Sequence, residues 1–356
     1  MDAQDLDFLG WDRSLAGQAS VSGDATASVA RVAAVDRDQL LLLDDSGAFR
    51  ARLSGKFLHE AVSAADMPCV GDWVRVDKSP ADDFGVVHGV LPRRTILRRK
   101  AAGDSVDVQL IAANVDVVFV VQSCDYDFNL NRLERYLVMA RDGGAAPRVL
   151  LTKTDLVAPE LLADQVAQIR GAGIEVPVLT LSTVTRIGID ELQGALEPGK
   201  TYCFVGSSGV GKSTLINGLV GRDVLVTKAV SGTGEGRHTT VRRELVVLQN
   251  GAMVIDNPGM REFGVLGAGD GIEVSYADIT ARAADCHFRD CTHTSEPGCA
   301  VLKAVESGDI DGEHYANFLK LRKESEFYEL SYAERRKKDK DFGRFVKSVK
   351  KDLGED

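Results

Sequence analysis

The chain has 356 residues, 44% of them hydrophobic and 27% charged, which suits two or three globular domains and excludes a disordered or fibrous protein. Its 53 acidic and 43 basic residues give a formal net charge of −10, which argues against a general nucleic-acid coat but does not exclude local basic patches. The longest apolar runs fall far short of the roughly 18 residues that a membrane span needs, and the acidic start lacks a secretory n-region. We therefore expect a cytoplasmic protein without membrane contact.

Short apolar runs separated by turn residues fill the first part of the chain. Residues 1–23 are predicted to be a flexible lead-in. The strands expected after it are residues 28–35, 40–43, 48–53, 72–76 and 85–91. Five short strands within about 70 residues favour a small closed barrel of the OB-fold type over residues 24–100, and a small β-sandwich is the alternative. A basic stretch, Arg93–Lys100, follows directly and could contact RNA.

The pattern changes over residues 101–264, where apolar strand-like runs alternate with segments of helix length. The expected strands are residues 115–121, 149–151, 176–181, 202–205, 245–248 and 252–255. Apolar strands that alternate with helices indicate an α/β domain with a largely parallel sheet covered on both faces. Residues 265–356 are expected to form a helical C-terminal domain around a group of cysteines.

A phosphate-binding motif follows the predicted strand 202–205 and precedes a predicted helix. It has the pattern GxxxxGKS and reads Gly206, Ser207, Ser208, Gly209, Val210, Gly211, Lys212, Ser213, Thr214. Glycines let the backbone N–H groups surround phosphate oxygens, and the helix N-terminus adds its positive dipole end. Lys212 would contact the β and γ phosphates, and the Ser213 hydroxyl would bind Mg²⁺. The motif predicts a nucleoside triphosphate site, and a purely structural glycine turn is the alternative.

Two further strand ends bear on the nucleotide. Asp256 opens the sequence DNPG, in which its carboxylate would hold Mg²⁺ through water and the Gly259 N–H would sense the γ-phosphate. The second strand end is the sequence Thr152, Lys153, Thr154, Asp155. There the Asp155 carboxylate can accept hydrogen bonds from the guanine N1–H and amine, a donor pair that adenine lacks. A helix N-cap is the alternative for Asp155. Ser182, after the strand 176–181, would supply backbone contacts to the base.

Three of the six cysteines lie close together near the C-terminus, with a histidine among them. Cys286, Cys291, His293 and Cys299 offer the Cys3His donor set that suits one tetrahedral structural Zn²⁺. In a reducing compartment such a cluster indicates a metal site in preference to a disulfide framework. Three reduced thiols beside a surface histidine are the alternative. Because four protein ligands leave no open position, this metal would stiffen a loop and not catalyse.

The order of the nucleotide motifs is unusual. In ordinary GTPases the phosphate loop comes first, followed by DxxG, NKxD and SA, whereas here residues 152–155 and Ser182 precede the phosphate loop and DNPG follows it. This is the order of a circularly permuted GTPase. With a barrel before it and C-x4-C-x-H-x5-C after it, the chain resembles the ribosome small-subunit-dependent GTPase family (RsgA type) over residues 20 to 350. The resemblance implies a monomeric GTPase that binds GTP and GDP, is stimulated by the 30S subunit and assists its late maturation.

The resemblance also assigns roles around the γ-phosphate. Residues 236–240 look like switch I, in which Thr239 or Thr240 would complete the Mg²⁺ shell; Thr240 is our choice. Met260 stands at or near the place where many GTPases keep a water-orienting glutamine. A thioether cannot orient water, so the isolated enzyme should be slow, and His238 is the nearest catalytic substitute. A solvent-facing loop histidine is the alternative for His238.

One residue departs from the GTPase motif. Thr152 stands where the motif prefers Asn, so the hydroxyl is kept and the amide is lost, a change that bears on loop stability and on the affinity for guanine. Specificity for guanine should survive because Asp155 is retained. His287, beside Cys286, lies outside the zinc pattern of the family.

The last segment, Glu334–Lys351, is strongly basic. It carries nine Lys or Arg and three Asp or Glu, interleaved with Phe342 and Phe345, so it could bind 16S rRNA by charge and stacking; a solvated helix face is the alternative. Two other functions remain open: an RNA-binding module with a vestigial nucleotide site, and an ATP-dependent phosphotransferase on the same phosphate loop.

Overall fold

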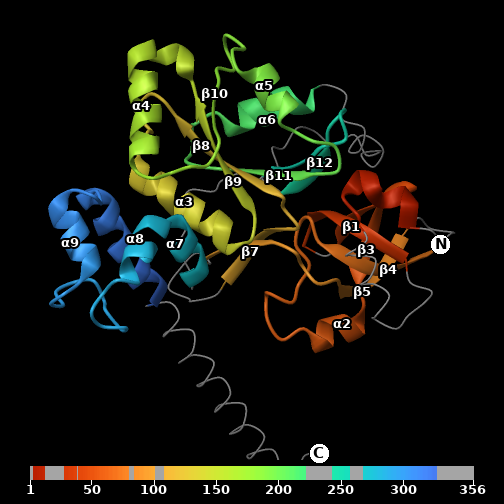
Figure 1. Ribbon diagram of the computed structural model, residues 1–356. Coiled ribbons are helices and arrows are strands. Elements are labelled where there is room, and N and C mark those ends of the chain that lie inside the picture. Colours follow the sequence, from red (N-terminus) through yellow and green to blue (C-terminus); the bar gives the residue numbers. More distant parts are fainter. Residues whose placement is uncertain are drawn as a thin grey trace, which may run out of the picture.

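The computed structural model shows a β-barrel, a sheet with helices on both faces, and a C-terminal group of helices (Figure 1). It describes residues 3–12, 28–37, 39–79, 84–100, 108–221, 243–256 and 268–326. No helix within these ranges combines the length and the apolar character that a membrane crossing requires.

The N-terminal barrel is closed. Its strands are β1 (Ser28–Val35), β2 (Leu40–Asp44), β3 (Gly47–Leu53), β4 (Trp73–Ser79) and β5 (Phe84–Val90), with helix α2 (Gly55–Glu60) after β3. They pair in the order β1-β2-β3-β5-β4, and β4 returns to pair with β1. The pairing of β3 with β5 is parallel, and the other four are antiparallel. This closed order of five strands confirms the expected OB-like barrel.

The first residues of the chain pack against the barrel. A short 3-10 helix, η1 (Ala3–Leu9), buries Leu9, and Trp11 meets Trp73 edge-on with ring centroids 4.7 Å apart. Leu6, Leu9 and Trp11 are thus part of a core, which differs from the flexible lead-in that the sequence suggested. Residues 13–27 lie outside the described ranges.

The basic stretch after the barrel forms part of a small second sheet. Strands β6 (Ile96–Lys100) and β7 (Val108–Ala113) pair antiparallel and were not expected. Arg93 forms an ion pair with the buried Asp72 at 2.7 Å, and Arg98 forms one with Asp142 at 3.0 Å. These two guanidinium groups therefore serve contacts within the protein, which weakens the reading of the stretch as an RNA contact.

The central sheet has the order β10-β9-β8-β11-β13-β12. Its strands are β8 (Val117–Ser123), β9 (Ala146–Thr152), β10 (Val178–Thr180), β11 (Thr201–Val205), β12 (Glu244–Val247) and β13 (Met253–Asp256). All neighbouring strands are parallel except β12, which runs antiparallel to β13. The expected largely parallel α/β sheet is confirmed.

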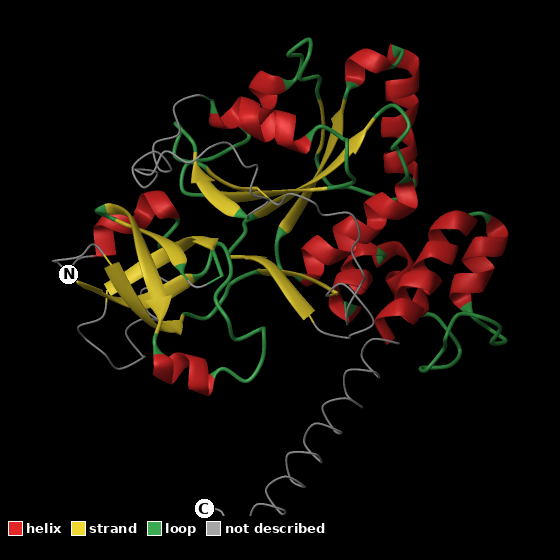
Figure 2. Ribbon diagram, turned by 180° about the vertical axis from the view of Figure 1, so that it is seen from behind, coloured by secondary structure: helices red, strands yellow, loops and turns green. Residues whose placement is uncertain are grey.

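Alternate side chains of β8 belong to two separate cores, one on each face of this sheet. Helices cover both faces (Figure 2). Val118 and Val120 share a core with residues of α3 (Leu130–Asp142) and α4 (Pro159–Gly171). Phe119 lies in a second core with residues of α5 (Ile189–Gly194) and α6 (Lys212–Val220). The apolar strands of the sequence are therefore buried on both sides.

The C-terminal helical part packs against α3. It contains α7 (Gly269–Ser275), α8 (Ala277–Ala283), α9 (Ala300–Ser307) and a further helical segment, residues 312–326. Val138 of α3 belongs to the same apolar core as Ile272, Tyr276 and Phe318 of this part. The helical C-terminal part that the sequence indicated is thus present over residues 268–326. The basic segment Glu334–Lys351 lies outside the described residues.

Candidate nucleotide site and metal cluster

Four parallel strands bring the nucleotide motifs to one edge of the central sheet. Strands β9, β8, β11 and β13 are consecutive neighbours and run in the same direction. Their carboxyl ends therefore meet at one edge, which is where ligands bind to open α/β sheets. Thr152 ends β9 and residues 153–155 follow it, the phosphate loop follows β11, and Asp256 ends β13. Asp155 and Lys212 consequently belong to the same end of the molecule despite the permuted order.

The phosphate loop has the backbone that its glycines predict. Gly206 has φ of 149°, and a Cβ atom there would lie 2.1 Å from the Val121 carbonyl oxygen, so no other residue fits. Gly211, with φ of 96°, stands directly before α6, whose first turn carries Ser213 and Thr214. The free N–H groups of this helix terminus face the loop, as phosphate binding requires.

The Lys212 ammonium lies across the phosphate loop. Its Nζ donates hydrogen bonds to the carbonyl oxygens of Gly206 and Ser207, at 2.8 and 2.5 Å. The positive charge is therefore held over the concave side of the loop, where phosphate oxygens would be bound.

Thr152 joins the two nucleotide loops. Its hydroxyl oxygen lies 2.6 Å from the carbonyl oxygen of Val210 in the phosphate loop and 3.2 Å from that of Gln122. Thr152 is buried, so this contact is shielded from water. The hydroxyl that Thr keeps therefore provides a direct bond between the loops.

The rest of the guanine-side loop is ordered by neighbouring strand ends. Lys153 adopts a left-handed backbone with φ of 58°, its Nζ lies 3.1 Å from Asp125 Oδ2, and it sits 5.0 Å from the ring centre of Tyr126. Asp155 is exposed at the start of η2 (Thr154–Leu156), where its carboxylate is free to meet a ligand.

The loop after β10 closes against this one. The Thr154 N–H donates to the Leu181 carbonyl oxygen at 3.4 Å. Ser182 is fully buried, and its hydroxyl oxygen accepts hydrogen bonds from the N–H groups of Val184 and Thr185, both at 3.1 Å. Ser182 therefore shapes the loop, which leaves backbone groups for contact with a base.

Two carboxylates beside the phosphate loop were missed in the sequence. Asp125 and Asp127 follow β8, the strand between the two nucleotide strands. Burial raises the pKa of Asp127 even though Arg132, 2.9 Å away, the Ser207 hydroxyl and Lys212 oppose that rise. For Asp125, hydrogen bonds from Ser123 and Lys153 outweigh burial and lower the pKa. The sequence signal that could have identified these two carboxylates is a run of polar residues directly after an apolar strand.

Several predicted site residues cannot be placed. Gly259 and the switch I residues His238, Thr239 and Thr240 lie outside the described part of the chain. Asp256 is placed only by its backbone at the end of β13.

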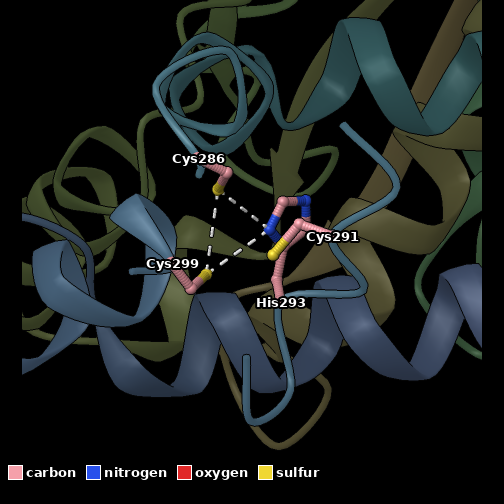
Figure 3. A group of neighbouring side chains, drawn as sticks. All are labelled: Cys286, Cys291, His293 and Cys299. Carbon is pink, nitrogen blue, oxygen red and sulfur yellow. Dashed lines mark hydrogen bonds between the residues drawn. The ribbon is translucent and has the colours of Figure 1, made fainter. Parts of the chain in front are cut away.

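The four predicted zinc ligands form one cluster (Figure 3). The donor atoms of Cys286, Cys291, His293 and Cys299 all lie within 4.8 Å of one another. His293 Nδ1 is 3.5 Å from Cys286 Sγ and 3.6 Å from Cys299 Sγ, and these sulfurs are 3.9 Å apart. A tetrahedral zinc with bonds of about 2.3 Å to sulfur and about 2.0 Å to nitrogen would space its donors by roughly 3.5–3.8 Å. The cluster therefore fits one zinc ion.

Hydrogen bonds outside the cluster hold its loop. The Glu296 carboxylate accepts from the N–H groups of Thr292 at 2.8 Å and Thr294 at 3.0 Å. The Tyr315 hydroxyl donates to the carbonyl oxygen of His293 at 2.5 Å, and His293 has a left-handed backbone with φ of 62°. His287, next to Cys286, is exposed, meets the Phe288 ring edge-on and is not one of the clustered donors. The loop is thus shaped to point His293 inward.

Comparisons with known proteins agree with this architecture. The family model described as RsgA GTPase matches residues 90–266. Small ribosomal subunit biogenesis GTPase RsgA 2 from Lactiplantibacillus plantarum is 42% identical over 92% of this chain and 91% of its own. The crystal structure of YjeQ from Thermotoga maritima, 25% identical, superposes with a TM-score of 0.63 over 83% of this chain and 97% of its own. A second solved structure, YloQ, a circularly permuted GTPase, has 23% identity and a TM-score of 0.62 over 85% and 96% of the two chains.

The permuted nucleotide motifs, the closed barrel, the Cys3His cluster and the full-length similarity to curated relatives lead to one assignment. The chain belongs to the RsgA GTPase family.

Proposed function

We propose that this protein hydrolyses GTP to GDP and phosphate, that the small ribosomal subunit stimulates it, and that it assists late maturation of that subunit in the cytoplasm. Support comes from its family and from the names of its relatives, which describe small ribosomal subunit biogenesis GTPases. The domains of the proposal are the barrel of residues 24–100, the GTPase domain of residues 101–264 and the zinc-binding domain of residues 265–356.

The proposal rests mainly on the hydrogen bond that joins the loop after β9 to the phosphate loop. The 2.6 Å contact from Thr152 to Val210 fixes the loop of Asp155 beside the loop of Lys212. A nucleotide with its phosphates over Lys212 would therefore extend its base toward Asp155. The carboxylate accepts from two guanine donors and finds no such pair on adenine, so the base would be guanine.

Hydrolysis would be in-line attack of water on the γ-phosphate. Lys212 and the N–H groups of residues 206–214 would stabilise the charge that develops on the phosphoryl oxygens. Ser213, Thr240 and Asp256 would hold Mg²⁺, which when bound would supply additional positive charge at these oxygens. We assign orientation of the attacking water to His238.

The metal and RNA contacts complete the proposal. Cys286, Cys291, His293 and Cys299 would hold one zinc ion, which stiffens the loop between α8 and α9. The protein would act as a monomer on the 30S subunit, and its basic segment Glu334–Lys351 would contact 16S rRNA.

The test is GTP turnover by the purified protein with and without purified 30S subunits. We expect subunits to raise turnover at least about tenfold, and Lys212→Ala to abolish it in both conditions because the phosphate charge is no longer offset. His238→Ala should lower the stimulated rate without weakening GTP binding.

Three outcomes would contradict the proposal. Absence of stimulation would remove the ribosomal role, and equal hydrolysis of ATP would favour a phosphotransferase. RNA binding without any nucleotide binding would favour a vestigial site. Co-sedimentation with 30S subunits should be stronger with a non-hydrolysable GTP analogue than with GDP.

A further inference from the structure

Helix α3 lies between the central sheet and the C-terminal helical part (Figure 1). On one side, Leu133 and Leu137 are buried in the core under the sheet. On the other side, Val138 is buried in the core of the C-terminal helical part. Gly271 of α7 comes so close that a Cβ atom there would lie 2.6 Å from the Val138 carbonyl oxygen. Helix α3 is therefore closely packed against both the central sheet and the C-terminal helical part. A shift of α3 would disturb the packing on both sides.

A buried carboxylate forms the polar centre of this contact. Glu134, on α3, is only 4% exposed. Its Oε1 lies 2.5 Å from His314 Nδ1, and its Oε2 accepts a hydrogen bond from the Tyr276 hydroxyl at 3.0 Å. The Asn317 side-chain amide also donates to Oε2, at 2.5 Å, and to the Tyr276 oxygen, at 2.9 Å. All three partners of Glu134 come from the C-terminal helical part.

The network continues to a second carboxylate. His314 Nε2 lies 3.3 Å from Asp278 Oδ1, so the imidazole joins the carboxylates of Glu134 and Asp278. A carboxylate as buried as that of Glu134 is tolerated only when it is paired and hydrogen-bonded. Its hydrogen bonds have preferred directions, so they fix the orientation of the groups that donate them. Apolar packing alone would hold the two parts together without fixing their orientation.

The beginning of the same helix is attached to the phosphate loop. Asn129 caps α3 by accepting a hydrogen bond from the Arg132 N–H at 2.8 Å. The backbone of Asn129 is bonded to the Gln122 side chain at 2.9 and 3.1 Å. Thr152 links Gln122 to Val210 of the phosphate loop through its hydroxyl, which lies 3.2 and 2.6 Å from their carbonyl oxygens. Arg132 is paired with Asp127, beside the same loop. Arg132 and Glu134 are only two residues apart on one rigid helix. The contacts of α3 thus run from the phosphate loop to the C-terminal helical part without passing through residues 257–267.

We propose that Glu134 is a positioning residue, which fixes the orientation of the C-terminal helical part on α3 so that contact of that part with the small subunit acts on the nucleotide site. The inference rests on the proposed function, because it concerns stimulation by the subunit. Glu134 itself touches neither nucleotide nor metal, so the reaction without subunits does not need it.

The experiment compares Glu134→Gln with Glu313→Gln in the full-length protein. Both changes replace a carboxylate by an amide of the same shape. Glu313 is exposed and stands next to His314, so it controls for the change of charge. For each variant we would measure zinc content, GTP affinity, turnover alone, and turnover with saturating 30S subunits.

The expected result is a selective loss. Glu134→Gln should keep zinc content, GTP affinity and unstimulated turnover within about twofold of wild type, while stimulated turnover falls about tenfold, because a misoriented docked part loses most of the coupling free energy. Glu313→Gln should behave as wild type. Tyr276→Phe removes the two hydrogen bonds of the hydroxyl, to Glu134 and from Asn317, but keeps the packing and the bonds of Glu134 to His314 and Asn317. It should therefore lose less than Glu134→Gln, and it provides the readout if that variant does not fold.

A double variant separates positioning from simple damage. Glu134→Gln and His314→Gln should each lower stimulation, and the double variant should be no worse than the more severe single one, because both remove the same contact. Full stimulation of Glu134→Gln and of Tyr276→Phe would overturn the inference. An equal fall of stimulated and unstimulated turnover would do the same. If wild type itself is not stimulated, the proposed function fails and this inference falls with it.

Discussion

The two parts attached to the central sheet are joined to it in different ways. The barrel is joined through the backbone, because β1 pairs with β12 at Ala34 and Glu244 and thereby continues the sheet. The C-terminal helical part is joined through side chains on α3, centred on Glu134 and Val138. Backbone pairing within one sheet fixes geometry tightly, whereas a side-chain contact can open without disturbing the sheet. We infer that the barrel is a fixed part of the GTPase and that the helical part is docked on it.

A buried arginine illustrates the tighter of these two interfaces. Arg31 of β1 is 1% exposed and donates to the carbonyl oxygens of Leu9, Gly71 and Asn114. It also donates to the Thr201 hydroxyl of β11 at 2.8 Å. Burial lowers the pKa of Arg31 to about 10, but it remains charged at neutral pH. One side chain thus ties the lead-in, the barrel and the central sheet together.

Loss of the proposed zinc ion should be the largest perturbation of the docked part. Cys291→Ser should reduce zinc from one ion per chain to nearly none, since zinc contributes about 10 kcal/mol to folding in small metal domains. Hydrogen exchange should then show loss of protection over residues 268–326, while the strands of the central sheet and the GTP affinity stay unchanged. His287→Ala, which alters an exposed histidine beside the cluster, is the control. Equal loss of protection in the sheet would show that the two parts are not separable.

Removal of Arg31 tests the fixed interface. Arg31→Met leaves three buried carbonyl groups without their donor and should lower the free energy of unfolding by about 3–5 kcal/mol. Urea unfolding followed by tryptophan fluorescence, which Trp11 and Trp73 report, and by far-UV circular dichroism should give coincident curves, because barrel and sheet unfold together. Arg52→Met, at an exposed position of β3, should have almost no effect. Separate transitions in wild type would contradict a fused unit.

The docked interface should depend on pH. Burial opposes protonation of His314, but hydrogen bonds to Asp278 and Glu134 raise its pKa to about 9, and Tyr276 packs against the same ring. Because the folded pKa exceeds the unfolded value of about 6.5, the stabilisation is complete below pH 6.5 and is lost as pH rises through 9. We expect a loss on the order of 2 kcal/mol in the stability of residues 268–326, followed by hydrogen exchange corrected for intrinsic rates. His314→Gln should remove this dependence, and an unchanged pH profile in that variant would assign it to another group.

The bond between the nucleotide loops gives the smallest expected change. Thr152→Val keeps the shape and removes the hydroxyl, so GTP and GDP should bind about tenfold more weakly, which corresponds to one buried hydrogen bond. Thr180→Val in β10 is the matched control. Thr152→Asn restores a side-chain donor and should bind GTP at least as well as wild type. Unaltered binding by Thr152→Val would show that the loops hold together without this bond.

Local signals made much of this structure predictable. The five barrel strands and the phosphate loop follow from turn residues, alternation of apolar positions and glycine spacing, which act within a few residues. The four predicted metal ligands form the expected cluster, since three cysteines and a histidine at this spacing have few other uses in a reducing compartment.

What the sequence did not reveal depends on distant contacts. Leu9 and Trp11 are too few to show a period, and they are buried only because Trp73 lies opposite. Nothing local marks Arg31 or Glu134 as buried, since both are charged residues whose partners come from far along the chain. The sequence does not show what the Thr152 hydroxyl binds, because its partner, the Val210 carbonyl oxygen, lies 58 residues further along the chain.

The central claim is that Asp155 reads the guanine of a nucleotide whose phosphates lie over Lys212. The most direct test is the affinity of Asp155→Asn for GTP, xanthosine triphosphate and ATP. The amide NH2 group of Asn donates a hydrogen bond at the position where a carboxylate oxygen of Asp155 accepted one. The variant therefore loses the hydrogen bond from the guanine amine and can donate one to the carbonyl that xanthine has at that position. We predict that GTP binds at least about a hundredfold more weakly, that xanthosine triphosphate binds more tightly than to wild type, and that ATP is unaffected. Undiminished GTP affinity in this variant would contradict the account.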